Sequence, residues 1–167
     1  AYEWTAQRGV PAPGSDIDLG RVVMIIGSEP VSVGAITAFN NAFGPFGLPP
    51  TAIKPSYGIA EATLLVATSE TPSVPRVTYV DRTALSEGRV VAVAADAPEG
   101  LPQVSCGRVA RSLWAVVVDP DTAAELPDGR VGEIWLQGRN IGRGYWGRAE
   151  ESRRTFGARL GPVLPAG

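Results

Sequence analysis

The sequence predicts an α/β protein in which an α/β layer is followed by a β-rich part. Three observations carry this prediction: a β-branched run that ends in glycine, an amphipathic helical pattern directly after it, and a series of short β-type runs from Leu64 onward. The chain has 167 residues, of which 44% are hydrophobic and 19% charged. This length and composition suffice for one ordinary globular core.

The α/β layer is expected near the N-terminus. The run "RVVMIIG" at 21–27 has the pattern of a strand buried on both faces. The segment 32–43 begins with Ser32, a suitable N-cap, and then places four apolar residues at helical spacing: Val33, Ile36, Phe39 and Phe43. "TAIKPSYG" at 51–58 predicts a second short strand that runs into a loop.

The β-rich part consists of short apolar runs separated by Pro, Gly and Asp. These runs lie at 64–70, 76–81, 89–95, 103–107, 113–119 and 130–138. "PDG" at 127–129 supplies turn dihedrals between the last two of them. The polar segment 147–156 predicts a closing helix.

Composition excludes several classes of function. A net charge of −2 with no basic block does not favour nucleic acid as a partner, and no apolar run approaches the ~18 residues of a transmembrane segment. Cys106 is the only cysteine, so we expect no intrachain disulfide and a cytoplasmic location. The chain has no histidine, which excludes Ser-His and Cys-His nucleophiles and histidine zinc sites within it.

"GSEPVS" at 27–32 is the first candidate binding loop. It follows the predicted buried strand, and ligands of open α/β sheets bind at the carboxyl ends of strands. Glycine in such a loop lets the backbone approach a ligand closely. The alternative is a plain strand-to-helix turn, with Ser32 as the cap and Glu29 favoured by the helix dipole.

"YGIAE" at 57–61 is the second candidate. The ring of Tyr57 beside Gly58 could stack on a planar base, and Glu61 could hold Mg²⁺, which is bound by few carboxylates plus phosphate oxygens. The alternative is a buried core tyrosine followed by a glutamate at a helix N-terminus.

Other stretches favour structural interpretations. The glycines at 138, 142 and 144 do not match the G-x-G-x-x-G spacing of dinucleotide sites. Cys106 without histidine is typical of a small buried hydrophobe. The aspartate pairs 16/18 and 119/121 lie in turns, where aspartate caps backbone amides.

Three ordered motifs together resemble the adenylate-forming superfamily of acyl and aryl ligases. They are "GSEP" (27–30), "YGIAE" (57–61) and "GEIWLQG…GYW" (132–138 and 144–146), with "SCGR" (105–108) as a further match. The resemblance covers almost the whole chain. It implies a middle slice of the large N-terminal domain of such an enzyme.

Within this superfamily, "SYGIAEATLLV" is similar to the "YG-[ML]-AEAT" form of fatty-acyl-AMP ligases. The resemblance implies an α/β part with nucleotide-binding loops at 1–68, a subfamily insertion at 69–103 and a β-rich part of the same domain at 104–167. The insertion contains "VDR-x-AL-x-x-GRVV", which resembles the segment thought to restrain the domain movement that lets CoA react. The Ala-, Arg-, Gly- and Pro-rich text suits a high-GC actinobacterial source.

The resemblance implies ATP-dependent activation of a fatty acid to acyl-AMP with release of pyrophosphate. Tyr57 is expected to stack on adenine, Glu61 to act in catalysis as a ligand of Mg²⁺, and Gly58 to leave room for the acyl carboxyl. Ala60 replaces the threonine that is frequent before the glutamate, so a hydroxyl contact to the α-phosphate is lost. The implied nucleotide-binding set is Gly27, Ser28, Glu29, Pro30, Ser56, Tyr57, Gly58 and Ala60.

The implied partners are a fatty acid and an acyl carrier protein or polyketide synthase that accepts the acyl group. This sequence does not contain the phosphate loop, the ribose-binding aspartate or the catalytic lysine of the family. The chain alone is therefore expected to be inactive. Two alternatives remain open: a fragment of an acyl-CoA ligase, and a non-catalytic nucleotide-binding or interaction module.

Overall fold

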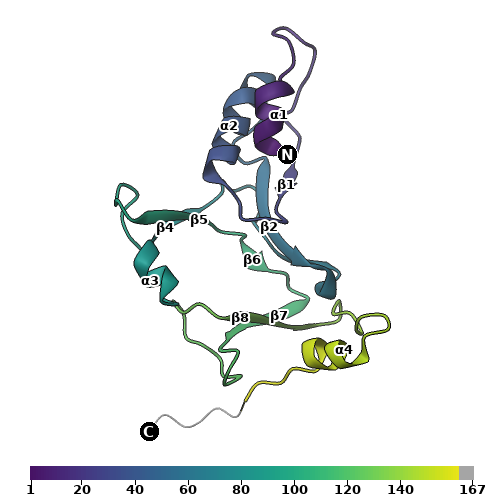
Figure 1. The fold of residues 1–167 in the computed structure, drawn as a ribbon. Helices are drawn as coiled ribbons and strands as arrows, with labels where there is room; N and C mark the ends of the chain where they lie inside the picture. Colours follow the sequence, from purple (N-terminus) through teal and green to yellow (C-terminus); the bar gives the residue numbers. More distant parts are fainter. Residues whose placement is uncertain (162–167) are drawn as a thin grey trace. The chain divides into compact units, whose positions relative to one another are not determined.

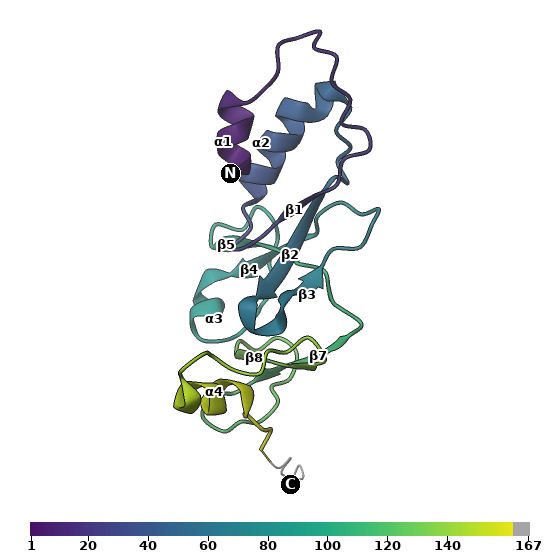
Figure 2. The same ribbon diagram turned by 90° about the vertical axis from the view of Figure 1, so that its right-hand side faces the viewer.

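A computed structural model describes residues 1–161, which form two compact units (Figures 1 and 2). Each unit is assembled from segments that are distant in sequence. The first unit comprises residues 1–57, 67–78 and 102–108. The second comprises 58–66, 79–101 and the chain from 109 onward.

The first unit begins with helices packed on a parallel strand pair. Strand β1 (Met24–Ile26) pairs in parallel with β2 (Ile53–Ile59), and Met24 lies opposite Ile53. Helices α1 (Tyr2–Arg8) and α2 (Val33–Phe43) lie side by side in both ribbon views, and the 3₁₀ helix η1 (Gly44–Phe46) follows α2. The strand, helix and second strand predicted from the sequence are therefore present.

Helix α2 forms where the apolar periodicity predicted it. Its N-cap is Ser32, whose Oγ accepts a hydrogen bond from the amide of Ala35 at 3.2 Å. Its core-facing residues are Ala35, Ile36, Phe39 and Phe43. The rings of Phe39 and Phe43 stack at 4.4 Å, and Tyr2 of α1 meets Phe39 edge-on at 5.0 Å. Buried apolar contact of this kind stabilises the helix pair.

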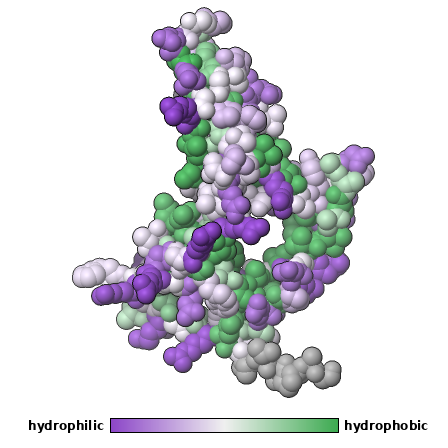
Figure 3. Space-filling view, turned by 180° about the vertical axis from the view of Figure 1, so that it is seen from behind, coloured by the Kyte–Doolittle hydropathy of each residue, from purple (hydrophilic) through white to green (hydrophobic). Residues whose placement is uncertain are grey.

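The expectation that 21–27 is buried on both faces is wrong. The strand covers only Met24–Ile26, and of its side chains only Ile26 is buried, while Ile25 is 67% exposed. Helices cover one face of β1, and β1 is an edge strand of its sheet. Apolar residues outside the core also occur elsewhere on the surface, where Figure 3 shows several green areas on the face in view.

The remaining strands complete the four-stranded sheet that contains β1 and β2 and form two further pairs. Strand β3 (Leu64–Thr68) lies between β2 and β6 (Arg108–Val109), and β4 (Val77–Asp81) pairs with β5 (Gly100–Val104). In the second unit, β7 (Leu113–Val118) and β8 (Glu133–Gly138) are antiparallel, with Leu113 opposite Gly138 and Val118 opposite Glu133. The β-rich part predicted from the sequence is confirmed in these strands.

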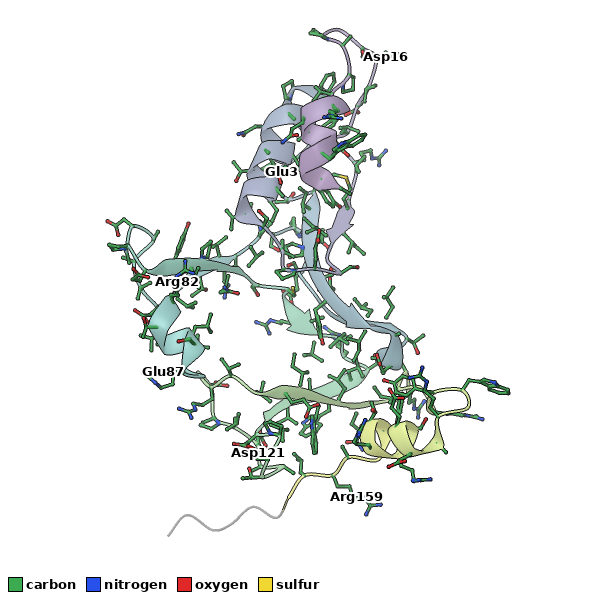
Figure 4. The ribbon with its side chains drawn as sticks, in the orientation of Figure 1. Glu3, Asp16, Arg82, Glu87, Asp121 and Arg159 are labelled. Atoms are coloured by element: carbon green, nitrogen blue, oxygen red, sulfur yellow. The ribbon has the colours of Figure 1, made fainter. Side chains whose placement is uncertain are left out.

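The second unit also contains short helices. They are η2 (Ala60–Ala62), α3 (Arg82–Ser86) and α4 (Ala149–Phe156), the last of which confirms the predicted closing helix. Asp81 caps α3, since its Oδ1 accepts from the amide of Ala84 at 2.7 Å. Arg82 at the start of α3, labelled in Figure 4, lies 3.6 Å from Glu99. Both partners are mostly exposed, so this ion pair contributes little to stability.

The strand expected at 89–95 is not formed. Two isolated bridges occur there, joining Val80 to Ala92 and Arg89 to Arg130. Backbone amides along the run have different partners: the amide of Val90 donates to Gly129, and that of Val93 donates to Tyr79. A β-type composition therefore does not produce a strand here, because no single neighbouring strand runs alongside the whole segment.

The α/β class and the β-rich second half are confirmed by these elements. Among residues 1–161, no helix is long and apolar enough to cross a membrane. The division at residues 68 and 103 concerns subfamily organisation and stays a prediction.

Candidate functional site

The loop 27–30 starts where β1 ends. A Cβ on Gly27 would lie 2.5 Å from the carbonyl oxygen of Ser56, so only glycine lets this loop pass so close to β2. Ser28, Glu29 and Pro30 are exposed. Gly27 thus lies against Ser56, and the three residues that follow Gly27 are accessible to a ligand.

Ser28 has an unusual backbone conformation. Its φ is +69°, in the left-handed region that residues with a side chain rarely occupy. Such conformations cost free energy and persist where the surrounding structure imposes them, often at ligand-binding sites. The positive φ of Ser28 is therefore a feature typical of binding loops, and the sequence motif did not predict it.

Ser56 and Tyr57 lie within β2. Ser56 is buried, and its Oγ is 2.8 Å from Oγ1 of Thr68 and 3.2 Å from the carbonyl oxygen of Lys54. Tyr57 is half-buried. The sequence placed this tyrosine where the strand gives way to a loop, but β2 continues to Ile59. Tyr57 therefore projects from regular backbone, which holds a ring more firmly than a loop does.

Gly58, Ala60 and Glu61 belong to the second unit. A Cβ on Gly58 would lie 1.8 Å from the carbonyl oxygen of Leu64, so the close return of β3 requires a glycine there. Ala60 is exposed at the start of η2, and Ala62 at its end is completely buried. Glu61, between them, is half-buried, so the short helix anchors itself through Ala62 and leaves Glu61 in contact with solvent.

The carboxylate of Glu61 has a partner far along the chain. The phenol of Tyr145 donates a hydrogen bond to Glu61 Oε1, and the amide of Gly142 donates to the Glu61 carbonyl at 2.7 Å. The bond from Tyr145 is the main cause that lowers the pKa of Glu61, and a hydrogen bond from the backbone amide of Glu61 itself is the second. The same bond is the main cause that raises the pKa of Tyr145. The hydrogen bond from Tyr145 favours the ionised form of the Glu61 carboxylate.

Sequence reasoning placed Tyr145 in a family motif and assigned it no role. Because 84 positions separate Tyr145 from Glu61, the sequence does not show that the two residues form a hydrogen bond. The available signal was the tyrosine between two glycines in "RGYWG", a setting in which a ring is presented on a tight loop.

The donor set limits the kind of metal site that is possible. No group of three or more His, Cys, Asp or Glu side chains able to enclose a metal occurs within residues 1–161. Glu61 offers one hard carboxylate, which matches the way Mg²⁺ is bound by one or two carboxylates together with substrate phosphates. The residues therefore fit a cation that arrives with a nucleotide, and they do not form an all-protein cage.

Comparison with known proteins identifies the family of the chain. A profile of the AMP-binding enzyme family matches residues 5–146. The long-chain-fatty-acid–AMP ligase FadD32 of Mycolicibacterium smegmatis is 54% identical over 158 residues, which cover 93% of this chain and 25% of that protein. The chain accordingly spans about a quarter of the length of the relatives it matches.

Solved structures give the same result. The fatty acid AMP ligase from Legionella pneumophila aligns with a TM-score of 0.83 and 31% identity, over 92% of this chain and 27% of that one. The fatty acyl-adenylate ligase from L. pneumophila in complex with acyl adenylate and pyrophosphate aligns with a TM-score of 0.82 and 32% identity, over 91% of this chain and 26% of that one.

This chain shares the α/β fold of these two ligase structures. The chain belongs to the AMP-binding enzyme family, and the fold expected from the resemblance, a slice of the N-terminal domain of adenylate-forming enzymes, is confirmed.

Proposed function

We propose that the protein containing this chain activates a fatty acid with ATP. An oxygen of the fatty carboxylate attacks the α-phosphorus, the bond to the bridging oxygen breaks, and pyrophosphate leaves with that electron pair, giving acyl-AMP. The observation that carries this proposal is the Glu61 carboxylate inside "YGIAE", which accepts a hydrogen bond from Tyr145, in a chain 54% identical to a long-chain-fatty-acid–AMP ligase.

Loop 27–30 and strand β2 would supply the surfaces that bind the nucleotide. Tyr57 presents a half-buried ring from β2, suited to stacking on adenine. The backbone of 28–30 would line the other side of the nucleotide, since it is exposed. That loop passes close to β2 at Gly27, where an added Cβ would lie 2.5 Å from the carbonyl oxygen of Ser56.

The segment directly after Tyr57 would supply the residues nearest the reacting groups. Glu61 would be the ligand of Mg²⁺, and when bound this ion supplies charge neutralisation for the phosphates. Gly58 would leave space for the acyl carboxyl, in addition to its packing against Leu64. Ala60 has no hydroxyl, so the α-phosphate would find its hydrogen-bond donors elsewhere in the protein.

The acyl group would pass from acyl-AMP to an acyl carrier protein or polyketide synthase in the cytoplasm. Segment 69–103 would be the subfamily insertion that restrains transfer to CoA. This proposal agrees with the similarity to proteins named AMP ligases. The chain alone would lack the phosphate loop and the catalytic lysine, so it would not catalyse the reaction by itself.

Glu61→Gln in the full-length protein tests the proposal through ATP–pyrophosphate exchange with a fatty acid. Glutamine keeps the shape and an oxygen acceptor for Tyr145 but removes the charge. We expect about a 10²-fold loss, as for other single electrostatic contacts at reacting centres. Glu99→Gln is the matched control, because Glu99 is exposed and pairs only weakly with Arg82.

An exchange rate within about twofold of the parent protein for Glu61→Gln would remove Glu61 from the reaction. Supplying CoA and the carrier protein separately, and measuring which thioester forms, decides between an acyl-AMP ligase and an acyl-CoA ligase. Absence of any exchange in the full-length parent protein would favour the non-catalytic module.

A further inference from the structure

Four hydrogen bonds join the loop 139–145 to the turn that contains Glu61. Three of them involve main-chain atoms: the amide of Gly142 donates to Glu61, Nδ2 of Asn140 donates to Ala62 at 2.7 Å, and Oγ1 of Thr63 donates to Asn140 at 2.6 Å. The fourth comes from the phenol of Tyr145 and reaches the carboxylate itself. These bonds therefore fix the position of the loop relative to the turn.

Helix α4 fixes Tyr145 within this loop. The amide of Tyr145 donates to Oγ of Ser152 at 2.8 Å, and its ring meets Phe156 edge-on at 5.2 Å. Gly144 has φ of +145°, and a Cβ there would lie 2.8 Å from the same Oγ. The phenol thus approaches Glu61 from a backbone that has little freedom to shift.

The four bonds have different effects. The three main-chain bonds determine where the turn lies, and they remain if the phenol oxygen is removed. The bond from Tyr145 determines only where the carboxylate points. A half-exposed glutamate otherwise exchanges among rotamers, and ordering such a side chain costs conformational entropy. A partner that orders it in advance removes that cost from ligand binding.

We propose that Tyr145 is a positioning residue that orients the Glu61 carboxylate for the cation of a metal–nucleotide complex. The inference rests on the proposed function, in which Glu61 is the metal ligand. Tyr145 acts through Glu61 and touches neither the cation nor the nucleotide. Partners that orient a metal ligand typically change metal affinity or activity ~10-fold or more when they are removed.

The test uses Tyr145→Phe in the full-length protein, because phenylalanine keeps the ring against Phe156 and removes only the hydroxyl. Calorimetric binding of a non-hydrolysable ATP analogue is measured as a function of Mg²⁺ concentration. We expect the Mg²⁺ concentration for half-maximal analogue binding to rise about 10-fold, with little change in melting temperature. Tyr79→Phe, the same change on half-buried Tyr79 of β4, is the matched control and should leave both unchanged.

A second comparison separates this inference from the proposed function. In a Glu61→Gln background, Tyr145→Phe should add no further loss, because the two residues act as one unit. If Glu61→Gln has no effect, the proposed role of Glu61 fails. If Glu61→Gln abolishes Mg²⁺-dependent binding while Tyr145→Phe does not alter it, only the positioning role fails.

A Tyr145→Phe protein that loses stability and analogue binding in parallel, with an unchanged Mg²⁺ dependence, would also overturn the inference. So would a variant that no longer folds, since the hydroxyl would then support the fold rather than the carboxylate.

Discussion

Gly58 faces the carbonyl oxygen of Leu64 so closely that a Cβ on Gly58 would lie 1.8 Å from that oxygen. Because the contact is to backbone, no side-chain rotation can relieve it. Gly58→Ala should therefore displace the β2–β3 connection and destabilise the protein by about 3 kcal/mol, in the upper range for overpacking. A urea-unfolding midpoint of the full-length protein measures this.

The control for Gly58→Ala is Gly34→Ala in α2. The nearest atom to a Cβ at Gly34 is Oγ of Ser32 at 3.6 Å, an ordinary contact. Alanine is also the better helix former, so this variant should be neutral or slightly stabilising. Equal urea-unfolding midpoints for the two alanine variants would mean that the carbonyl oxygen of Leu64 does not prevent a side chain at position 58.

Local features of this chain could be read from sequence because they depend on neighbouring residues. Helix α2 shows its apolar period and its Ser32 cap in twelve consecutive positions, and both are present in the structure. Motif residues such as Gly27 and Gly58 could also be singled out. Glycine is needed at both because of backbone neighbours, Ser56 and Leu64, that the motif alone does not reveal.

Features that depend on contacts between segments far apart in the sequence could not be predicted from local patterns. The exposure of Ile25 depends on which face of β1 the helices cover, and the irregular run at 89–95 depends on where its amides find partners. The bond between Tyr145 and Glu61 joins residues from two separate motifs. Pattern reasoning identified both motifs, but only the fold shows that they meet.

Lys54, the single lysine of the sequence, is buried at 3% exposure. Its Nζ donates to the carbonyl oxygens of Glu70 at 2.9 Å and Ser73 at 3.1 Å. Lys54→Met preserves the length of the side chain but removes both bonds. Since hydrogen bonds to charged groups contribute about 1.5–3 kcal/mol each, we expect a loss of roughly 2 kcal/mol or more in a urea-unfolding measurement.

Arg76→Met serves as the control for Lys54→Met, because Arg76 is exposed in the same unit. Its replacement should change the free energy of unfolding by less than about 0.5 kcal/mol, as is usual for surface sites. A Lys54→Met protein as stable as the parent would show that the 70–73 segment does not depend on the ammonium group.

Ser28 holds φ of +69° in the loop that we propose lines the nucleotide. Glycine adopts this conformation without the Cβ penalty, which is about 1 kcal/mol for other residues. Ser28→Gly should therefore raise the unfolding midpoint slightly and retain ATP–pyrophosphate exchange, because the loop would act through its backbone. Ser28→Val should lower both, since a β-branched side chain is least compatible with positive φ. If valine is tolerated at this position, the backbone conformation of the loop is not required for nucleotide binding.

Asp119 links stability to pH. Its Oδ1 accepts from the amides of Thr122 at 3.0 Å and Asp121 at 2.9 Å, and these bonds, in that order, lower its pKa. A carboxylate with a depressed pKa in the folded state contributes stability above its unfolded pKa, which is about 4 for aspartate. That contribution is lost as the pH falls through the folded value. The difference in unfolding midpoint between the parent and Asp119→Asn should therefore be largest near neutral pH and shrink below about pH 4. A parent–Asp119→Asn difference that stays constant down to the lowest accessible pH would show that the charge of Asp119 does not stabilise the turn.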